Sequence, residues 1–540
     1  MIHIRKLLFF LLGTLLLASC TTKTNSPEDE RPNFLFIAID DLNVYNTVLG
    51  EEQGSFLKKV YPNDSLRNVI INRLTPNINK LANEGLTFNR AYCSAPLCGP
   101  SRTSLLTGVP PHVSGYYHHD KHFRAYPTLT KVTTLPQYLR LNGYYTAGIG
   151  KVFHKGKAYL DRGCFSDWPD QIYSWNDWVN GHSGTSSGPD SKIESFETIS
   201  KYWPPKNKES LNFTRFGVTS LPAEKSNDYQ NAVFIGKLIT TGTAEKKDLS
   251  GELKKITVPE DKPYFLACGL FAPHLPWVVP QKFYDIFPQE EMSIDKELLE
   301  WVYNDLEDLD PKTKKRMLNS GFGKLIKHGI KIDGKGGDIN AWKTAFQAYL
   351  ATIAYADINV GVLLDALKNS PRKENTVVIL WSDHGYHVGD KHKEGKTSLW
   401  EAANHCNFII KDPRNSAISS GVNSNAPVTL QDIYPTIVSM AGLDRPAHVH
   451  GNNLNALLNN TDTAWTTPAL STNGEGNHTI RTKDYRYARY SSGAQELYNI
   501  AEDEFSYTNL AGKEAYAQVL EEMDTLLEEM LARKPGDFIR

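Results

Sequence analysis

The feature that most constrains the fold is an apolar run at residues 33–39 that ends in Asp40 and Asp41. Because nearly every position in the run is apolar, it predicts a strand buried on both faces, as in a parallel sheet covered by helices. Runs of the same kind predict further strands at residues 144–150, 263–271 and 375–381. The last of these is also followed closely by an acidic residue, Asp383.

Helical patterns separate these strands. Residues 75–84 and 134–142 each carry Pro just inside the start and Gly just after the end, which is typical of a complete helix. Residues 341–367 have apolar periodicity over a length that fits one or two helices. Strands that alternate with helices predict an α/β fold, with a mostly parallel central sheet flanked by helices.

The length of 540 residues indicates two or three packed units. We expect a main domain over residues 32–464, containing an insertion of loops and short elements at about 155–260. The pattern changes near Trp465. Strands at 485–490 and 496–500 and a helix at 513–531 predict a smaller C-terminal α+β subdomain over residues 465–540.

Residues 1–19 have the pattern of a secretion signal, with Arg5 and Lys6 ahead of an apolar run too short to span a bilayer comfortably. The closing Leu17-Ala18-Ser19-Cys20 resembles the bacterial lipobox, in which the Cys is acylated. An ordinary signal peptide with a chance Cys is the alternative. We expect a lipid anchor at Cys20, a flexible tether over residues 20–31, and a location in the bacterial cell envelope with membrane contact through that anchor.

The formal net charge of −2 gives no global field that would attract nucleic acid, so we expect no nucleic-acid partner. An anionic substrate would need a local basic pocket. Besides Cys20 there are five scattered Cys, an odd number. They form no disulfide framework, and their spacing fits no zinc site.

Charged residues gather where the predicted strands end. Ligands in open α/β sheets bind outside the carboxyl ends of the strands. Taken singly, each Asp is more simply a helix N-cap or a turn residue. Taken together, three carboxylates and an imidazole suit a hard divalent cation such as Ca²⁺. The predicted ligands are Asp40, Asp41, Asp383 and His384.

A second cluster is the segment Cys98-Gly99-Pro100-Ser101-Arg102, with Thr107-Gly108 further along. Pro100 fits the first turn of a helix and Gly108 its end, which places Cys98 just before the helix N-terminus. Anions are stabilised there, and Arg102 lies one turn further on. This pattern is compatible with a reactive thiol near an anionic substrate and, equally, with a buried Cys ahead of an ordinary helix.

The Cys-x-Pro-x-Arg pattern with its downstream Thr-Gly resembles the signature of type I formylglycine-dependent sulfatases, in the alkaline phosphatase superfamily. Residues 150–154 and 272–277 resemble the Lys/His and second His motifs of the iduronate-2-sulfatase-like branch. Residues 382–385 and Lys396 resemble its second metal element and its late active-site Lys. Two departures from the pattern, a longer segment at 44–74 and His392-Lys393-Glu394-Gly395 before Lys396, concern substrate identity.

The resemblance implies the chemistry. Cys98 would be oxidised to formylglycine (3-oxoalanine) by a formylglycine-generating or radical maturation enzyme, and its hydrate would attack sulfur. One Ca²⁺ ion would be held by Asp40, Asp41, residue 98, Asp383 and His384. Arg102, Lys151 and Lys396 would surround the sulfate with positive charge. His274 would protonate the leaving oxygen and His154 would accept the second diol proton.

The implied substrate is a sulfated glycan, either algal, such as ulvan or carrageenan, or a glycosaminoglycan. A His-rich basic loop offers possible substrate contacts, and Trp277 could stack on a sugar ring; a mobile loop and a core Trp are equally good interpretations. His387 and Asp390 are further candidates for the pocket. The loop residues considered are His112, His118, His119, Lys121, His122 and Arg124.

Two other functions remain open from the sequence. One is a phosphodiester or phosphonate monoester hydrolase of the same superfamily. The other is an inactive, glycan-binding lipoprotein on the same scaffold.

Overall fold

The computed structural model describes residues 31–154, 170–180, 216–248, 251–328 and 338–539. The predicted signal segment, Cys20 and the tether up to residue 30 lie outside these residues. So do parts of the predicted insertion, including Cys164.

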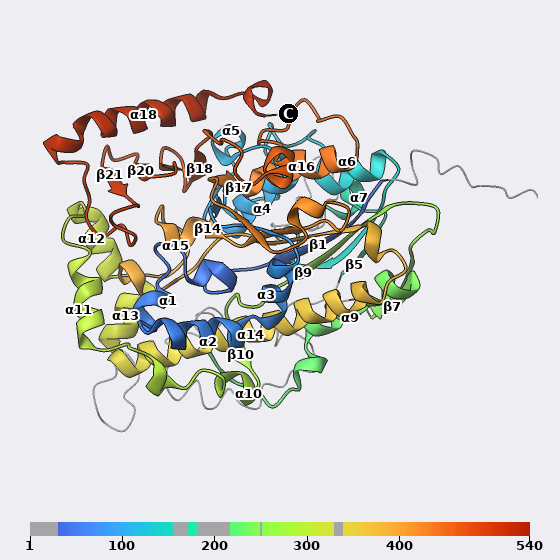
Figure 1. The fold of residues 1–540 in the computed structure, drawn as a ribbon, viewed down its shortest axis with the longest axis horizontal. Helices are drawn as coiled ribbons and strands as arrows, with labels where there is room; N and C mark the ends of the chain where they lie inside the picture. The colour runs from blue at the N-terminus through green and yellow to red at the C-terminus, as the bar shows by residue number, and fades with distance from the viewer. Residues whose placement is uncertain (1–30, 155–169, 181–215, 249–250, 329–337, 540) are drawn as a thin grey trace, which may run out of the picture.

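An eight-stranded sheet forms the centre of the molecule (Figure 1). Its four middle strands are all parallel, and two antiparallel pairings, β11 with β15 and β15 with β2, lie toward one side. This confirms the predicted mostly parallel α/β fold. In sheet order the strands are β16 (Val422–Ser424), β2 (Leu86–Phe88), β15 (Phe408–Lys411), β11 (Thr376–Ser382), β1 (Asn33–Ile39), β9 (Tyr264–Leu270), β4 (Tyr145–Gly150) and β5 (Asp177–Val179).

Both faces of the sheet are covered, which explains the uniformly apolar strands. Alternate residues of β1 point to opposite sides: Ile37 packs into one core and Phe36 into the other. The first face carries α2 (Asp64–Leu74), α3 (Pro76–Asn83), α9 (Asn227–Thr241) and α14 (Asp338–Lys368). The second carries α4 (Cys98–Thr107), α6 (Leu135–Leu141) and α16 (Ile433–Met440) (Figure 1).

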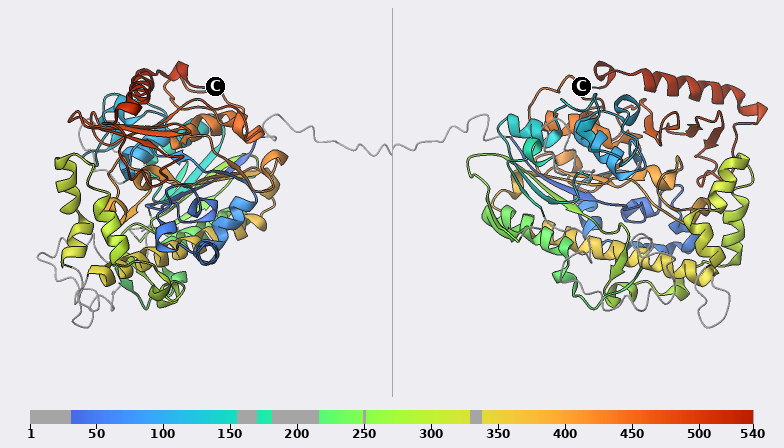
Figure 2. Two further views of the ribbon diagram at one scale, coloured as in Figure 1. Left: turned by 60° about the vertical axis from the view of Figure 1, so that its left-hand side comes forward. Right: turned by 180° about the vertical axis from the view of Figure 1, so that it is seen from behind.

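Helix α14 is one continuous helix of 31 residues. Among the described residues it is the one helix long and apolar enough to cross a membrane, but 72% of its most apolar window is buried. It runs beside α9 under the sheet in both orientations of Figure 2. These contacts are those of a core helix.

The expectation of only loops and short elements at residues 155–260 is wrong for its last third. Helix α9 spans 15 residues there and packs against α14. Its buried residues Ala232, Ile235, Leu238 and Ile239 have helical spacing. Averaging over the Ser-, Gly-, Pro- and Lys-rich stretch around it obscured this pattern.

The C-terminal part forms a second layer with its own small core (Figure 2). Helix α18 (Ala517–Ala532) packs on a four-stranded antiparallel sheet through Met523, Leu527 and Met530. This is the smaller α+β subdomain expected from the sequence. Its strands are β18 (Ala469–Thr472), β19 (His478–Arg481), β20 (Tyr485–Arg489) and β21 (Gln495–Asn499).

Shorter elements complete the described chain. The helices are α1 (Leu57–Val60), α5 (Pro111–Ser114), α7 (Gln171–Ser174), α10 (Gln281–Tyr284), α11 (Lys296–Asn304), α12 (Pro311–Leu318), α13 (Gly321–His328), α15 (Glu401–Asn404) and α17 (Asn455–Asn459). The strands are β3 (Ala91–Tyr92), β6 (Phe216–Val218), β7 (Thr243–Lys247), β8 (Leu253–Thr257), β10 (Trp277–Val279), β12 (His387–Val388), β13 (Glu394–Gly395), β14 (His405–Cys406) and β17 (Val428–Thr429).

Candidate active site

The candidate site lies at the carboxyl edge of the four middle strands, β11, β1, β9 and β4. Each strand ends at one part of the site, as is general for open α/β sheets. Asp383 and His384 follow β11, while Asp40 and Asp41 follow β1. The His274 loop follows β9, and Lys151 follows β4. Residues far apart in sequence thus meet because their strands are neighbours.

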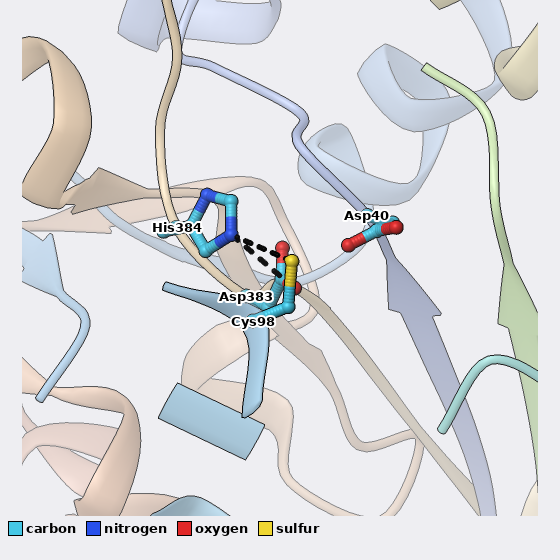
Figure 3. A group of neighbouring side chains, drawn as sticks. All are labelled: Asp40, Cys98, Asp383 and His384. Carbon is cyan, nitrogen blue, oxygen red and sulfur yellow. Dashed lines mark hydrogen bonds and ion pairs between the residues drawn. The ribbon is translucent and has the colours of Figure 1, made fainter. Parts of the chain in front are cut away.

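Helix α4 brings Cys98 to this edge. Pro100 lies in its first turn, and Gly108 ends it in the left-handed region at φ 70°. Cys98 is the first residue of the helix and is 1% exposed. Its Sγ lies 3.2 Å from His384 Nε2 and 3.0 Å from Lys396 Nζ. Figure 3 shows the sulfur beside His384 and Asp383, with Asp40 nearby.

The carboxylates have the arrangement of a cation site. Ligand atoms of Asp40, Cys98, Asp383 and His384 lie within 4.8 Å of one another. Asp40, Asp41, Cys98 and His274 form an overlapping group by the same measure. Three buried carboxylates around one point offer the oxygen ligands that a hard divalent cation prefers, so the donor set fits such an ion.

Backbone contacts hold two of these ligands in place. The Asp41 N–H donates to Asp383 Oδ1 at 3.1 Å, and Asp41 has a left-handed φ of 59°. The Tyr349 hydroxyl, from α14, donates to the Asp41 carbonyl at 2.7 Å. The Ser101 hydroxyl donates to the Asp383 carbonyl at 2.5 Å. The loop after β1 and the start of α4 are therefore fixed to each other through β11.

Burial and the neighbouring charges shift the pKa values of the three carboxyls in different directions. Burial opposes ionisation of Asp40, but Lys151, His274 and Arg102 outweigh it and hold its pKa well below the usual range. Burial also opposes ionisation of Asp41, yet Lys396 and His274 lower its pKa. For Asp383 burial prevails over Arg102 and raises the pKa.

Arg102 has a different place from the one expected. Its side chain is fully buried, with Nε 2.8 Å from Asp383 Oδ2 and Nη2 3.2 Å from Asp40 Oδ1. Its Nη1 donates to the Lys151 and Val152 carbonyls. Every nitrogen is engaged by protein, so Arg102 positions the acidic ligands and the end of β4 instead of facing a sulfate.

The two lysines lie close to Cys98. Lys151 forms an ion pair with Asp40, with Nζ 3.8 Å from Cys98 Sγ. Lys396 forms one with Asp41 at 2.6 Å. A Cβ on Gly269 would lie 2.2 Å from the Lys151 backbone, so only glycine lets β9 approach this residue so closely.

Three histidines line the outer part of the site. His274 Nε2 lies 3.8 Å from Asp41 Oδ2, and its side chain is 18% exposed. His119 Nδ1 lies 2.8 Å from His154 Nε2, so His119 joins the site through His154. Burial lowers the pKa of both His274 and His119 to about 4, and it also lowers that of His154.

Three of the possible substrate residues lie elsewhere. Trp277 is 1% exposed, donates to the Pro273 carbonyl at 2.7 Å and packs on Tyr349, so no face is open to a sugar. Arg124 is buried in an ion pair with Asp170 at 2.5 Å. His112 lies edge-on to His478 of β19, at the C-terminal sheet. The predictions for Trp277 and Arg124 are wrong because both side chains are buried in contacts with the protein, whereas His112 is half-buried.

His387 and Asp390 do not face the pocket either; they are buried against each other and against Ser398. Sequence reasoning missed Asp228, near the start of α9, whose Oδ2 accepts the N–H groups of Phe271 and Ala272 at 3.0 and 2.9 Å. Asp228 thereby supports the His274 loop. Its position just after Ser226, ahead of an apolar helical pattern, was the available signal.

This geometry defines a class of protein: an α/β enzyme with residues that could hold a cation and a Cys at a helix N-terminus, at the carboxyl edge of its sheet. Residues 32–443 match the family model named Sulfatase, and residues 390–533 match N-sulphoglucosamine sulphohydrolase, C-terminal. The chain belongs to the sulfatase family. It is a sulfuric ester hydrolase.

Curated relatives agree with this assignment. A sulfatase of Formosa agariphila is 30% identical, covering 96% of this chain and 91% of the relative. Human iduronate 2-sulfatase is 27% identical over 69% of this chain and 65% of its own length. An ulvan-active sulfatase of Formosa agariphila is 25% identical, covering 99% of this chain and 88% of the relative.

Solved structures share the fold. A phosphonate monoester hydrolase of Agrobacterium radiobacter is 19% identical, with a TM-score of 0.65 over 92% of this chain and 96% of its own. The structure of BT4656 in complex with its substrate D-glucosamine-2-N,6-O-disulfate is 20% identical, with a TM-score of 0.60 over 93% of this chain and 97% of its own.

Proposed function

We propose that this enzyme removes sulfate from a sulfated glycan, using residue 98 as formylglycine and one calcium ion. The observation that carries the proposal is the surroundings of Cys98 Sγ. Lys396 and His384 lie within 3.2 Å of it, and Lys151 Nζ is 3.8 Å away. The two lysines would stabilise an anion such as a sulfate ester in its transition state once a bound cation offsets the neighbouring carboxylates.

The sequence similarity supports a glycan as substrate. One relative is named an ulvan-active sulfatase, and another is named iduronate 2-sulfatase. Sulfated algal glycan, including ulvan and carrageenan, and glycosaminoglycan are the candidate classes. The formal net charge of −2 leaves binding of such polyanions to the local charges of the site.

Asp40, Asp41, Asp383, His384 and residue 98 would hold the calcium ion. When bound, the ion would supply positive charge that lowers the pKa of a coordinated hydroxyl and offsets charge on the sulfate. Arg102 keeps two of the carboxylates oriented through its bonds to Asp383 and Asp40.

A formylglycine hydrate would supply a hydroxyl nucleophile and, after transfer, a second hydroxyl whose loss of a proton expels sulfate and restores the aldehyde. A serine would leave a stable sulfate ester that needs separate hydrolysis. A formylglycine-generating or radical maturation enzyme would have to oxidise Cys98 first. Lys396 and Lys151 would stabilise the negative charge that develops near residue 98.

His274 is the candidate general acid. Its Nδ1 lies 2.6 Å from the Leu275 carbonyl and carries a proton, so Nε2, directed to the site, can donate only when the ring is doubly protonated. Burial, which lowers the His274 pKa to about 4, opposes that charged form, and the Asp41 and Asp40 carboxylates favour it. Substrate approaching over Lys396 would bring its leaving oxygen to this nitrogen. His154, with His119 behind it, would accept the second diol proton on the other side, next to Lys151.

Attachment to the cell envelope through acylated Cys20 remains part of the proposal. Its support is the Leu17-Ala18-Ser19-Cys20 pattern after an apolar run. Mass spectrometry of the N-terminal peptide from the native host would show a diacylglyceryl mass on Cys20; an unmodified, cleaved peptide would overturn it.

A turnover screen tests the reaction. The converted enzyme would be compared on an aryl sulfate, a phosphate diester, a phosphonate monoester, and defined oligosaccharides from ulvan, carrageenan and glycosaminoglycans. We expect sulfate release from one glycan class, with the Cys98→Ala variant inactive. A clear preference for the phosphorus substrates, or unmodified thiol at Cys98 in active protein from the native host, would refute the proposal.

A further inference from the structure

A hydrogen-bonded chain of three side chains lies behind the site and is not used in the mechanism above. Ser398 Oγ lies 2.7 Å from His387 Nε2, and His387 Nδ1 lies 2.5 Å from Asp390 Oδ2. The same carboxylate accepts the Val388 N–H through Oδ1 at 3.2 Å. Both ring nitrogens of His387 are therefore bonded.

These are the residue types of a serine hydrolase triad, but their burial excludes that role. Ser398 is 3% exposed and His387 is fully buried. His387 also packs edge-on against Trp400, 6.2 Å between ring centroids. No substrate carbonyl can reach the Ser398 hydroxyl, so the three residues act on the structure around them.

The structure around them is the turn that carries Lys396. His387 pairs with Gly395 across the β12–β13 ladder, and Gly395 directly precedes Lys396. The His387 side chain is hydrogen-bonded to Ser398, which lies two residues after Lys396. One histidine thus holds the chain on both sides of the lysine whose Nζ is 3.0 Å from Cys98 Sγ.

The turn has a backbone conformation that requires such support. Thr397 has a φ of 65°, in the left-handed region that a β-branched residue avoids. Its N–H donates to the Pro96 carbonyl at 3.0 Å, next to the start of α4. On the far side, Asn404 Nδ2 donates to the Ser398 carbonyl at 3.0 Å. The strained position is held by contacts on both flanks.

We propose that His387, oriented by Asp390 and bonded to Ser398, is a positioning residue that sets the place of Lys396 beside residue 98. The proposal rests on the proposed function only for its kinetic readout. Its physical basis is that an error of about 1 Å in a catalytic group can cost on the order of 10²-fold in rate.

A double-mutant cycle tests it. The converted, calcium-loaded enzyme would be assayed on an aryl sulfate as wild type, His387→Gln, Lys396→Ala and the double variant. We expect His387→Gln to lower kcat about 10-fold or more, with KM changing about 2-fold or less, and to have almost no further effect when Lys396 is already Ala. Independent, multiplying losses would overturn the proposal.

Conservative variants separate positioning from general stability. Ser398→Thr keeps the hydroxyl and should retain kcat, whereas Ser398→Ala should lose part of it; equal losses would contradict the proposal. His392→Gln is the matched control, since His392 is a buried histidine of the same hairpin that faces the Met317 carbonyl at 3.2 Å. The His392→Gln variant should lower the melting temperature, but its effect on kcat should not depend on whether residue 396 is Lys or Ala.

A crystal structure of His387→Gln gives an answer that does not depend on sulfatase turnover; Ser398→Ala would replace it if that variant does not fold. Movement of Lys396 Nζ away from residue 98, beyond the present 3.0 Å, supports the proposal. An unmoved lysine overturns it. Absence of wild-type activity would instead refute the proposed function, so the two failures are distinguishable.

Discussion

Two buried polar regions of this molecule use charge in opposite ways. At the junction between the main sheet and the C-terminal sheet, charged groups are matched with dedicated partners. Lys391 Nζ lies 2.6 Å from Asp305 Oδ1, and Arg481 Nε lies 3.1 Å from Glu401 Oε1. At the carboxyl edge of the main sheet, several cations and carboxylates converge on one sulfur atom instead.

The difference separates charges that hold the fold from charges that act on a substrate. A matched buried pair is costly to break, because removing one partner strands the other. In the cluster at the sheet edge, by contrast, like charges lie close together, and the side chain of residue 98 interacts with all of them. We therefore expect substitutions at the sheet edge to affect turnover mainly, and substitutions at the junction to affect stability mainly.

The largest effect is expected for Cys98→Ala. It removes the proposed nucleophile, so kcat for an aryl sulfate should fall by about 10³-fold or more. The melting temperature should stay close to that of wild type, because Cys98 forms no disulfide. A variant with substantial remaining turnover would refute the role of residue 98.

Removal of the proposed metal ion should have the next largest effect. EDTA treatment should lower turnover about 10²-fold or more, and Ca²⁺ should restore it better than Mg²⁺, because of the many carboxylate ligands. The melting temperature should fall as well, since bound ion stabilises the native state. Full activity after exhaustive chelation would show that the carboxylates serve another purpose.

His274→Ala should lower kcat by about 10²-fold for a sulfate ester with a poor leaving group. The loss should be smaller for an activated aryl sulfate, whose leaving oxygen needs no proton. His118→Ala, an exposed histidine of the His-rich loop, is the comparison variant. Equal losses on both substrates would argue against a general acid role for His274.

Lys391→Met tests the junction. It strands Asp305, which is 2% exposed and whose pKa burial already raises to about 7, so unfolding should become easier by about 3 kcal/mol. Urea denaturation followed by circular dichroism measures this loss. Turnover at 25 °C should remain within about 2-fold of wild type. A large fall in kcat with unchanged stability would contradict the idea that the junction charges serve stability and the sheet-edge charges serve turnover.

The smallest effect is a pH dependence at the same junction. Burial lowers the pKa of His112 to about 3 and that of His478 to about 4. In the unfolded chain both titrate near 6.5, so the unfolded state takes up protons first as pH falls. The stability contribution is complete above pH ~6.5 and declines toward pH ~4. Urea midpoints at pH 7 and pH 5 measure this decline.

His478→Gln should make that pH dependence shallower. An unchanged slope would mean that other groups cause it. A shallower slope without loss of turnover at pH 7 would sharpen the contrast with the sheet edge.

The sequence predicted the parts of the fold that have a strong repeating pattern. The four middle strands were predicted within a residue or two, because their burial on both faces makes nearly every position apolar. Gathering of Asp40 and Asp383 also followed, since parallel strands end at a common edge. The position of Lys151 was expected only from the family resemblance. Helix α9 was missed because one amphipathic segment was averaged with a polar stretch.

Roles that depend on partners could not be predicted. Arg102, Arg124 and Trp277 have side chains suited to substrate contact, and only their neighbours decide otherwise. Asp170, which neutralises Arg124, lies 46 residues away in sequence. For the same reason, the hydrogen bonds that join Asp390, His387 and Ser398 could not be predicted. No spacing rule shows that three nearby polar residues are bonded to each other.

The pairing of β1 with β11 also orders events during synthesis. Asp383 is made 285 residues after Cys98, which is roughly 15 to 60 s later at ordinary translation speeds. Until β11 is made and settles beside β1, the acidic ligands cannot close around Cys98. In the finished fold that thiol is 1% exposed. If Cys98 is oxidised as proposed, the maturation enzyme would have to act while the chain is still being made or is not yet folded.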